Sequence, residues 1–171
     1  MNLFALEGDP KRDLVDWRAS AKAHDDLRVS KMAVEACQIL CTVAHGFGRT
    51  APYKPTHDKH PCTVWAGQSA ANFADVILLA TSLIKEWAKR NDCLPSDHAS
   101  WKVVAWCKED WIENVEVYNF PHFERTRPPA VVPEEFRRDG LIESYRAFWQ
   151  SKQRMVYRRA AAPGWYKPEP A

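Results

Sequence analysis

The spacing of hydrophobic residues along the chain predicts a helical protein. Over residues 27–45, apolar side chains recur every three or four positions, which is the period of an amphipathic helix. A broader apolar face over residues 63–90 predicts a long buried helix with a break near Gly67. Polar residues suited to a helix cap begin the next segment, which predicts a helix over about 96–118.

The remaining segments are connectors and two further helices. Residues 11–23 have a weak helical pattern, and residues 141–159 predict a last helix that an aromatic tail follows. Residues 46–62 contain three Pro and two Gly, and residues 119–133 are also rich in Pro, so both should be loops. With no repeat and no strong strand pattern, the whole chain, 1–171, is expected to form a single compact all-α domain with long Pro- and His-rich loops.

Composition narrows the class of protein only modestly. The 171 residues are 46% hydrophobic and 27% charged, which is an ordinary globular balance. Five Cys, an odd number, and an opening segment unlike a signal peptide favour free thiols in the cytoplasm. The longest apolar stretch, 74–84, is too short to span a membrane and contains Asp75. We therefore expect a monomer with no membrane association.

Charge is more informative in its distribution than in its total, which is only +2. Residues 144–168 contain no acidic residue but six basic ones, namely Arg146, Lys152, Arg154, Arg158, Arg159 and Lys167. Six aromatic residues are interleaved with them, including Trp165 and Tyr166. Such a stretch is suited to following phosphates and stacking on bases. An ordinary solvated helix face with buried aromatics is the alternative.

Two clusters have residue types suited to catalysis. Within residues 53–65 lie Tyr53, Lys54, His57, Lys59, His60, Cys62 and Trp65. Histidine transfers protons near neutral pH and lysine can hold a phosphate, although a plain surface loop is the alternative. The second cluster, at the start of the 27–45 helix, contains His24, Asp25, Asp26, Arg28 and Lys31, with Glu35 one turn further on the same face. That face is a possible active-site wall, and helix capping is the alternative.

Metal and cofactor motifs are not expected. Cys37, Cys41 and His45 are spaced four apart, and His57, His60 and Cys62 could add ligands, but these spacings match no standard zinc pattern. Phosphate-binding glycine loops, dinucleotide motifs and nucleophile elbows are missing too. We therefore expect neither a metal nor a cofactor.

The C-terminal segment carries a resemblance to a known family. It opens with Pro133, Glu135, Phe136, Arg137 and Asp139 and closes with Trp165, Tyr166 and Lys167. This fifth of the chain resembles the C-terminal part of the phage pyrimidine-dimer DNA glycosylases of the endonuclease V type. The resemblance implies a compact all-α fold, contact of the basic helix with the DNA backbone, and contact of the aromatic tail with the lesion strand.

The N-terminal half departs from that family. Its members use the α-amine of an N-terminal Thr as a Schiff-base nucleophile, whereas position 2 here is Asn2. They also carry a catalytic Glu in a position that Arg28 occupies here, although Lys31 can stand for a family Arg. Asp25 or Asp26 could substitute for that Glu.

Three functions remain open. The first is group transfer in phage DNA hypermodification, in which an amine or amino acid displaces a phosphorylated 5-methyl substituent of an extruded pyrimidine. His57 or His60 would act as the base, and Arg28, Lys31 and Lys54 would neutralise the departing phosphate. The second is base excision through a Schiff base on Lys31, and the third is non-catalytic DNA binding.

These hypotheses share one set of partners and site residues. Double-stranded DNA is the expected partner, with a small amine or amino acid as a co-substrate, in a phage-infected bacterium. The expected catalytic residues are His57, His60, Lys31, Arg28 and Asp26, and the expected substrate-binding residues are Tyr53, Lys54, Trp65 and Asn72.

Overall fold

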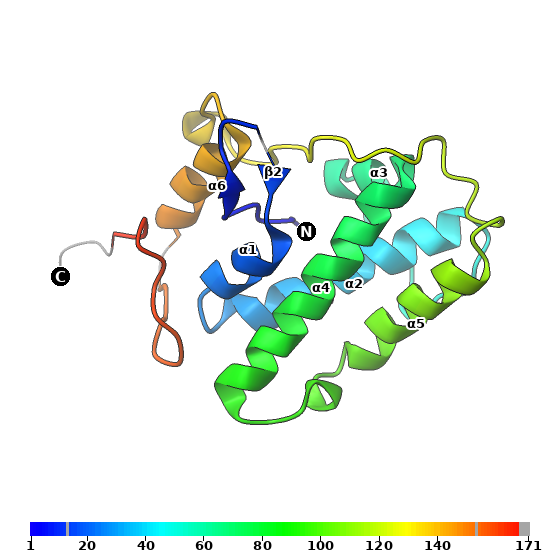
Figure 1. Cartoon of the computed structure of the whole chain (residues 1–171), viewed down its shortest axis with the longest axis horizontal. Helices are drawn as coiled ribbons and strands as arrows, with labels where there is room; N and C mark the ends of the chain where they lie inside the picture. Colours follow the sequence, from blue (N-terminus) through cyan, green and yellow to red (C-terminus); the bar gives the residue numbers. More distant parts are fainter. Residues whose placement is uncertain (13, 153, 168–171) are drawn as a thin grey trace.

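The computed structural model of the chain describes residues 1–12, 14–152 and 154–167. These residues form a mainly helical core of packed helices, as the hydrophobic spacing predicts (Figure 1). The helices are α1 (Trp17–Ala23), α2 (Arg28–Gly46), α3 (Pro61–Gln68), α4 (Ala70–Asn91), α5 (Trp101–Glu113) and α6 (Leu141–Gln150), with short 3-10 turns η1 (Pro95–Asp97) and η2 (Glu134–Phe136). None of the described helices is long and apolar enough to cross a membrane.

Helix α4 is the centre of the fold. It crosses in front of α2 in Figure 1 and also packs against α1, α3 and α5. Its buried face contributes Phe73, Val76, Leu79, Leu83 and Ile84 to one continuous core. The chain enters α4 from α3 through Ser69, whose extended backbone breaks the helix and whose hydroxyl accepts from the Ala71 N–H at 3.2 Å. The predicted break is therefore confirmed, two residues beyond Gly67.

The predicted helix over 11–23 is wrong in its first part. Strand β1 (Gly8–Asp9) pairs with β2 (Leu14–Val15) in a small antiparallel ribbon. Gly8 has φ +149, and a Cβ there would lie 2.0 Å from the Leu14 carbonyl oxygen, so the ribbon needs glycine at this position. Helix α1 begins only after Asp16, whose carboxylate caps the Ala19 N–H at 2.9 Å.

The predicted basic helix over 141–159 is also wrong, because α6 ends at Gln150. Two buried or nearly buried carboxylates hold the following segment in an extended path. Asp25 accepts from the Val156 N–H at 3.2 Å, and Asp26 accepts from the N–H groups of Arg158 and Arg159 at 2.7 and 3.0 Å. These N–H groups are used by side chains that lie far away in the sequence, so they are lost to helix formation.

Candidate active site

A small hollow at the start of the chain brings charged side chains together with the α-amino group of Met1. This N-terminal pocket has a volume of about 220 Å³ and is lined by Met1, Asn2, Phe4, Arg28, Lys31, Met32, Glu35, Phe148 and Lys152. Larger hollows exist elsewhere on the surface. The N-terminal pocket combines a carboxylate, three cationic side chains, the chain's α-amino group and two aromatic rings.

Glu35 is the centre of this pocket. One of its carboxylate oxygens accepts from the Asn2 N–H at 3.1 Å and lies 3.8 Å from the α-amino group of Met1. The other oxygen lies 3.7 Å from Lys31 Nζ, which α2 places one turn earlier on the same face. The Glu35 side chain is 17% exposed, so it is sheltered but reachable from solvent.

The chain start is held firmly in this position. The Asn2 side-chain amide donates to the Val131 carbonyl at 2.8 Å, and its oxygen accepts from the buried Tyr145 hydroxyl at 2.9 Å. Residues 3–6 are buried in the core. Asn2 thereby ties the pocket to α6 and to the 119–133 connector, which fixes the backbone that faces Glu35.

Two further cations, Arg28 and Lys152, line the pocket. Arg28 pairs with the buried Asp25 at 2.9 Å, and its guanidinium lies 5.7 Å from the centre of the Trp149 ring. Lys152 Nζ lies 3.8 Å from the centre of the Phe148 ring. Burial lowers the pKa of Lys152, and the positive charges of Arg28 and Lys31 lower it further.

His60, in the 53–65 loop, does not line the pocket but feels its charges. This residue caps α3, accepting from the Cys62 N–H at 3.2 Å, and is partly buried. Burial lowers the pKa of His60, as do the nearby α-amino group and His57, while Glu35 opposes the shift. His60 therefore lies within electrostatic range of both the chain start and Glu35. His57 is exposed beside it, with a left-handed backbone at φ +52.

Other residues expected at the site lie elsewhere. Asp26 pairs with Arg90 at 3.1 Å and holds the C-terminal segment, so it points away from the pocket. Tyr53 bonds to Ser100 Oγ at 3.0 Å, next to α5. Lys54 is exposed, and it does not line the N-terminal pocket.

Trp65 and Asn72 hold the connector in place. Trp65 Nε1 donates to the Thr126 carbonyl at 3.3 Å, and Asn72 is fully buried. The Asn72 amide bonds to Trp65 O and Thr126 Oγ1 at 2.9 and 2.8 Å and accepts from the Thr126 N–H at 2.9 Å. Their positions explain the ordered path of the Pro-rich 119–133 segment.

The residues expected to bind DNA do not share one helix face. Arg146 pairs with Glu7 at 2.6 Å, and Trp165 donates to the same carboxylate while stacking 5.0 Å from the Arg146 guanidinium. Tyr166 packs on Tyr157. The others lie along the extended segment: Arg154, Arg158, Arg159 and Lys167 are exposed, and Lys152 belongs to the N-terminal pocket.

Sequence reasoning missed the part played by the chain start and by Lys152. The four-residue spacing of Lys31 and Glu35 was a usable signal for one wall of the pocket. Nothing in the local sequence indicates that Asn2 and Lys152 meet that wall, because the contact depends on tertiary packing. Among the described residues, no group of three or more His, Cys, Asp or Glu side chains is placed to hold a metal ion.

Comparison of the chain with protein-family models, with curated proteins and with solved structures finds no match. The family resemblance of the C-terminal segment therefore stays a prediction.

Proposed function

We propose that this protein is a DNA-acting enzyme on a glycosylase-like helical scaffold, which transfers an amine or amino acid to the 5-substituent of an extruded pyrimidine. The observation that carries the proposal is the convergence of Glu35 and the cations Arg28, Lys31 and Lys152 on one pocket. His60 does not line this pocket, but its pKa responds to the charges of the chain start and of Glu35. The resemblance of the C-terminal segment supplies the class of substrate.

The pocket has the parts that recognition of a single base requires. Phe4 and Phe148 give it an aromatic wall, with ring centres 6.2 Å apart. Enzymes that act on an extruded base hold it between aromatic or apolar side chains. Exposed Arg154 and Arg158 lie on the adjoining segment, where they are available to the phosphates of the flanking strand.

In the proposed reaction, the nitrogen of the amine attacks the 5-methylene carbon of the base. A C–N bond forms, the C–O bond to the phosphate breaks, and inorganic phosphate leaves with the bonding pair. Glu35 or His60 takes the proton from the attacking nitrogen. Arg28, Lys31 and Lys152 neutralise the negative charge that develops on the departing phosphate.

Phosphate release tests this assignment. With duplex DNA containing 5-phosphomethyl-pyrimidine and a pool of amino acids, the protein should release inorganic phosphate only when both are present. Glu35→Gln should slow release by about 100-fold or more, which is the contribution of a positioned acid–base group. Asp58→Asn, on the exposed part of the 53–65 loop, is the matched control and should leave the rate unchanged. Equal rates in all three proteins would exclude Glu35 from the chemistry.

Base excision is the second candidate, and Lys152 is the observation that favours it. A lysine that is partly buried against aromatic rings and close to other cations has a lowered pKa and is a better nucleophile. In that reaction, neutral Lys152 Nζ would attack C1′ of the sugar, and the base would leave with the bonding pair of the glycosidic bond. Nζ would then lose a proton, and its lone pair would form the C=N bond of a Schiff base as the C1′–O4′ bond breaks and O4′ takes up a proton.

Borohydride trapping distinguishes the two candidates. Excision predicts a covalent protein–DNA adduct after reduction, which Lys152→Ala abolishes and Lys31→Ala does not. The transfer reaction predicts no adduct with either protein, because no bond forms between the protein and the DNA.

A further inference from the structure

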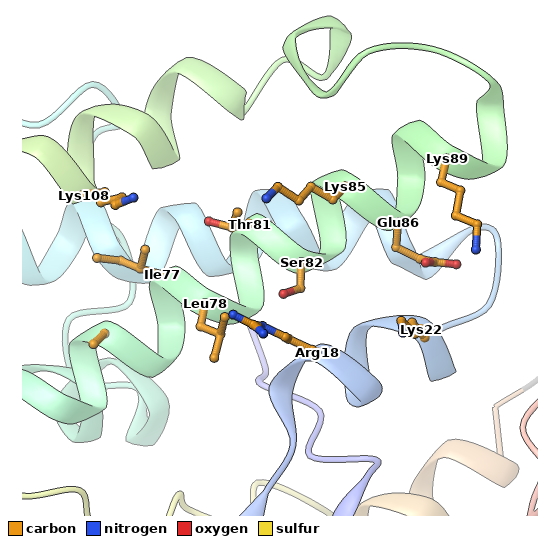
Figure 2. Close-up of a pocket in the computed structure, with 11 residues that line it drawn as sticks. Arg18, Lys22, Ile77, Leu78, Thr81, Ser82, Lys85, Glu86, Lys89 and Lys108 are labelled. Atoms are coloured by element: carbon orange, nitrogen blue, oxygen red, sulfur yellow. The ribbon is translucent and has the colours of Figure 1, made fainter.

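A second hollow lies on another part of the surface and is strongly basic. It has a volume of about 540 Å³ and shares no lining residue with the N-terminal pocket. We call it the α4 groove. Its floor is α4, and its sides are α1 and α5 (Figure 2). Five cations line it: Arg18, Lys22, Lys85, Lys89 and Lys108.

All five cations are exposed, and none forms an ion pair with another described residue. Glu86 is the single acidic residue of the groove lining. It bonds at 2.8 Å to Arg90, which lies outside the groove and also pairs with Asp26. Five cations thus face one carboxylate in the groove lining. The groove therefore carries an uncompensated positive charge.

The sequence spacing concentrates this charge. Arg18 and Lys22 stand four residues apart on α1, and Lys85 and Lys89 stand four apart on α4. Like charges at this spacing share one helix face and repel each other. The packing of α1 on α4 brings the two rows to opposite sides of one groove (Figure 2). A polyanion in the groove would relieve this repulsion and release its own counterions.

The neutral groups of the groove lining are also suited to binding a sugar–phosphate chain. Thr81 and Ser82 place hydroxyl groups between the basic rows, where they can donate to phosphate oxygens (Figure 2). Ile77 and Leu78 provide an apolar patch beside them. Hydroxyl donors beside cations are common in contacts with nucleic-acid backbones.

The basic surface continues towards the N-terminal pocket. A neighbouring hollow of about 300 Å³ shares Lys22 and Lys89 with the α4 groove and adds Arg159 from the C-terminal segment. The Arg158 and Arg159 N–H groups bond to Asp26. Asp25, the preceding residue, forms an ion pair with Arg28, which lines the N-terminal pocket. The C-terminal segment thus connects the two basic regions.

We propose that the α4 groove binds the phosphodiester backbone of DNA and guides it towards the N-terminal pocket. The proposal rests on the proposed DNA-acting function and assigns DNA contact to α1, α4 and α5, outside the C-terminal segment. The cations and hydroxyls of the lining are the groups that contact phosphate oxygens.

The test is the salt dependence of DNA binding by Lys85→Gln/Lys89→Gln. Each phosphate contact contributes about 0.9 to the slope of log affinity against log salt concentration. The double variant should therefore bind duplex DNA at least about tenfold more weakly at low salt, with a slope shallower by about 2. The charge-matched control Lys11→Gln/Lys102→Gln, which changes exposed lysines outside the groove, should keep the slope of the unmodified protein.

Each outcome is decisive. If the unmodified protein binds DNA and both double variants keep its slope, the groove proposal is overturned and the proposed function stands. If the unmodified protein does not bind DNA, the proposed function fails first. If the groove variant loses binding to phosphatidylserine vesicles but keeps its DNA affinity, the groove is a membrane surface and the proposal is overturned as well.

Discussion

His24 is a fully buried histidine between aromatic rings. Its ring centre lies 4.8 Å from that of Trp149 and 6.0 Å from that of Phe4. Nδ1 lies 2.7 Å from the Ser20 carbonyl oxygen and therefore carries the proton, whereas Nε2 has no hydrogen-bond partner among the described residues. Burial, together with the charges of Arg90 and Arg28, lowers the pKa of His24 to about 4, although the hydrogen bond to Ser20 opposes the shift.

This histidine makes stability depend on pH. The unfolded chain binds a proton near pH 6.5, but the folded protein does so only near pH 4, so folding is penalised as the pH falls through this window. We expect His24 to remove up to about 3 kcal/mol of unfolding free energy between pH 6.5 and 4. Urea unfolding at several pH values measures the loss. His24→Gln should flatten the dependence, and identical curves for both proteins would contradict the assignment.

Asn72 is a buried amide whose role is either to stabilise the fold or to bind substrate, and substitution distinguishes the two. Its three hydrogen bonds join α3, α4 and the connector. Asn72→Ala should lower the unfolding free energy by about 2 kcal/mol, because it leaves buried partners unpaired. Gln68→Ala, at an exposed position, is the control. A stable Asn72→Ala protein that has lost substrate affinity would instead support the sequence-based role in substrate binding.

At the level of elements, the path of the C-terminal segment is set by two acidic residues. Residues 151–159 have the basic and aromatic composition of the predicted helix, but Asp25 and Asp26 bind their backbone from the α1–α2 corner. Arg154 adopts a left-handed backbone at φ +57, which a continued helix would not allow. A local pattern cannot reveal such a competition, since the competing carboxylates are about 130 residues away in the chain.

Release of this segment is measurable by limited proteolysis. Asp26→Ala removes the acceptor of the Arg158 and Arg159 N–H groups, so trypsin should cut after these arginines faster than in the unmodified protein. Asp58→Ala provides the control at an exposed loop position. An unchanged cleavage rate in Asp26→Ala would mean that other contacts hold the segment.

Several elements were predictable because their signals are local. The three-to-four-residue spacing in α2 and α4 reflects one buried face on each helix, and the structure confirms both. The β1–β2 ribbon was not predictable in the same way, since its strands are two residues long and show no alternation. Its formation depends on Gly8 and on the packing of α1 behind it.

At the scale of the whole molecule, the fold joins segments that the sequence keeps apart. Lys31 and His60 were expected to act together, and both lie near Glu35. Asn2 and Lys152 are 150 residues apart in the chain, and the packing of α6 against residues 3–6 brings them to this pocket. The basic regions also differ in how far the sequence reveals them. The basic composition of the C-terminal segment is visible in the sequence, whereas the α4 groove is assembled from three helices and has no sequence signature.

The central claim is that the N-terminal pocket transfers a group to a pyrimidine in DNA. Nucleoside mass spectrometry of DNA treated with the pure protein tests it most directly, using DNA with 5-phosphomethyl-pyrimidine, a pool of amino acids, and Glu35→Gln in parallel. The account predicts a new nucleoside whose mass reports the added amine with loss of phosphate, formed by the unmodified protein and nearly absent with Glu35→Gln. Release of a free base without any heavier nucleoside would contradict the account and establish excision.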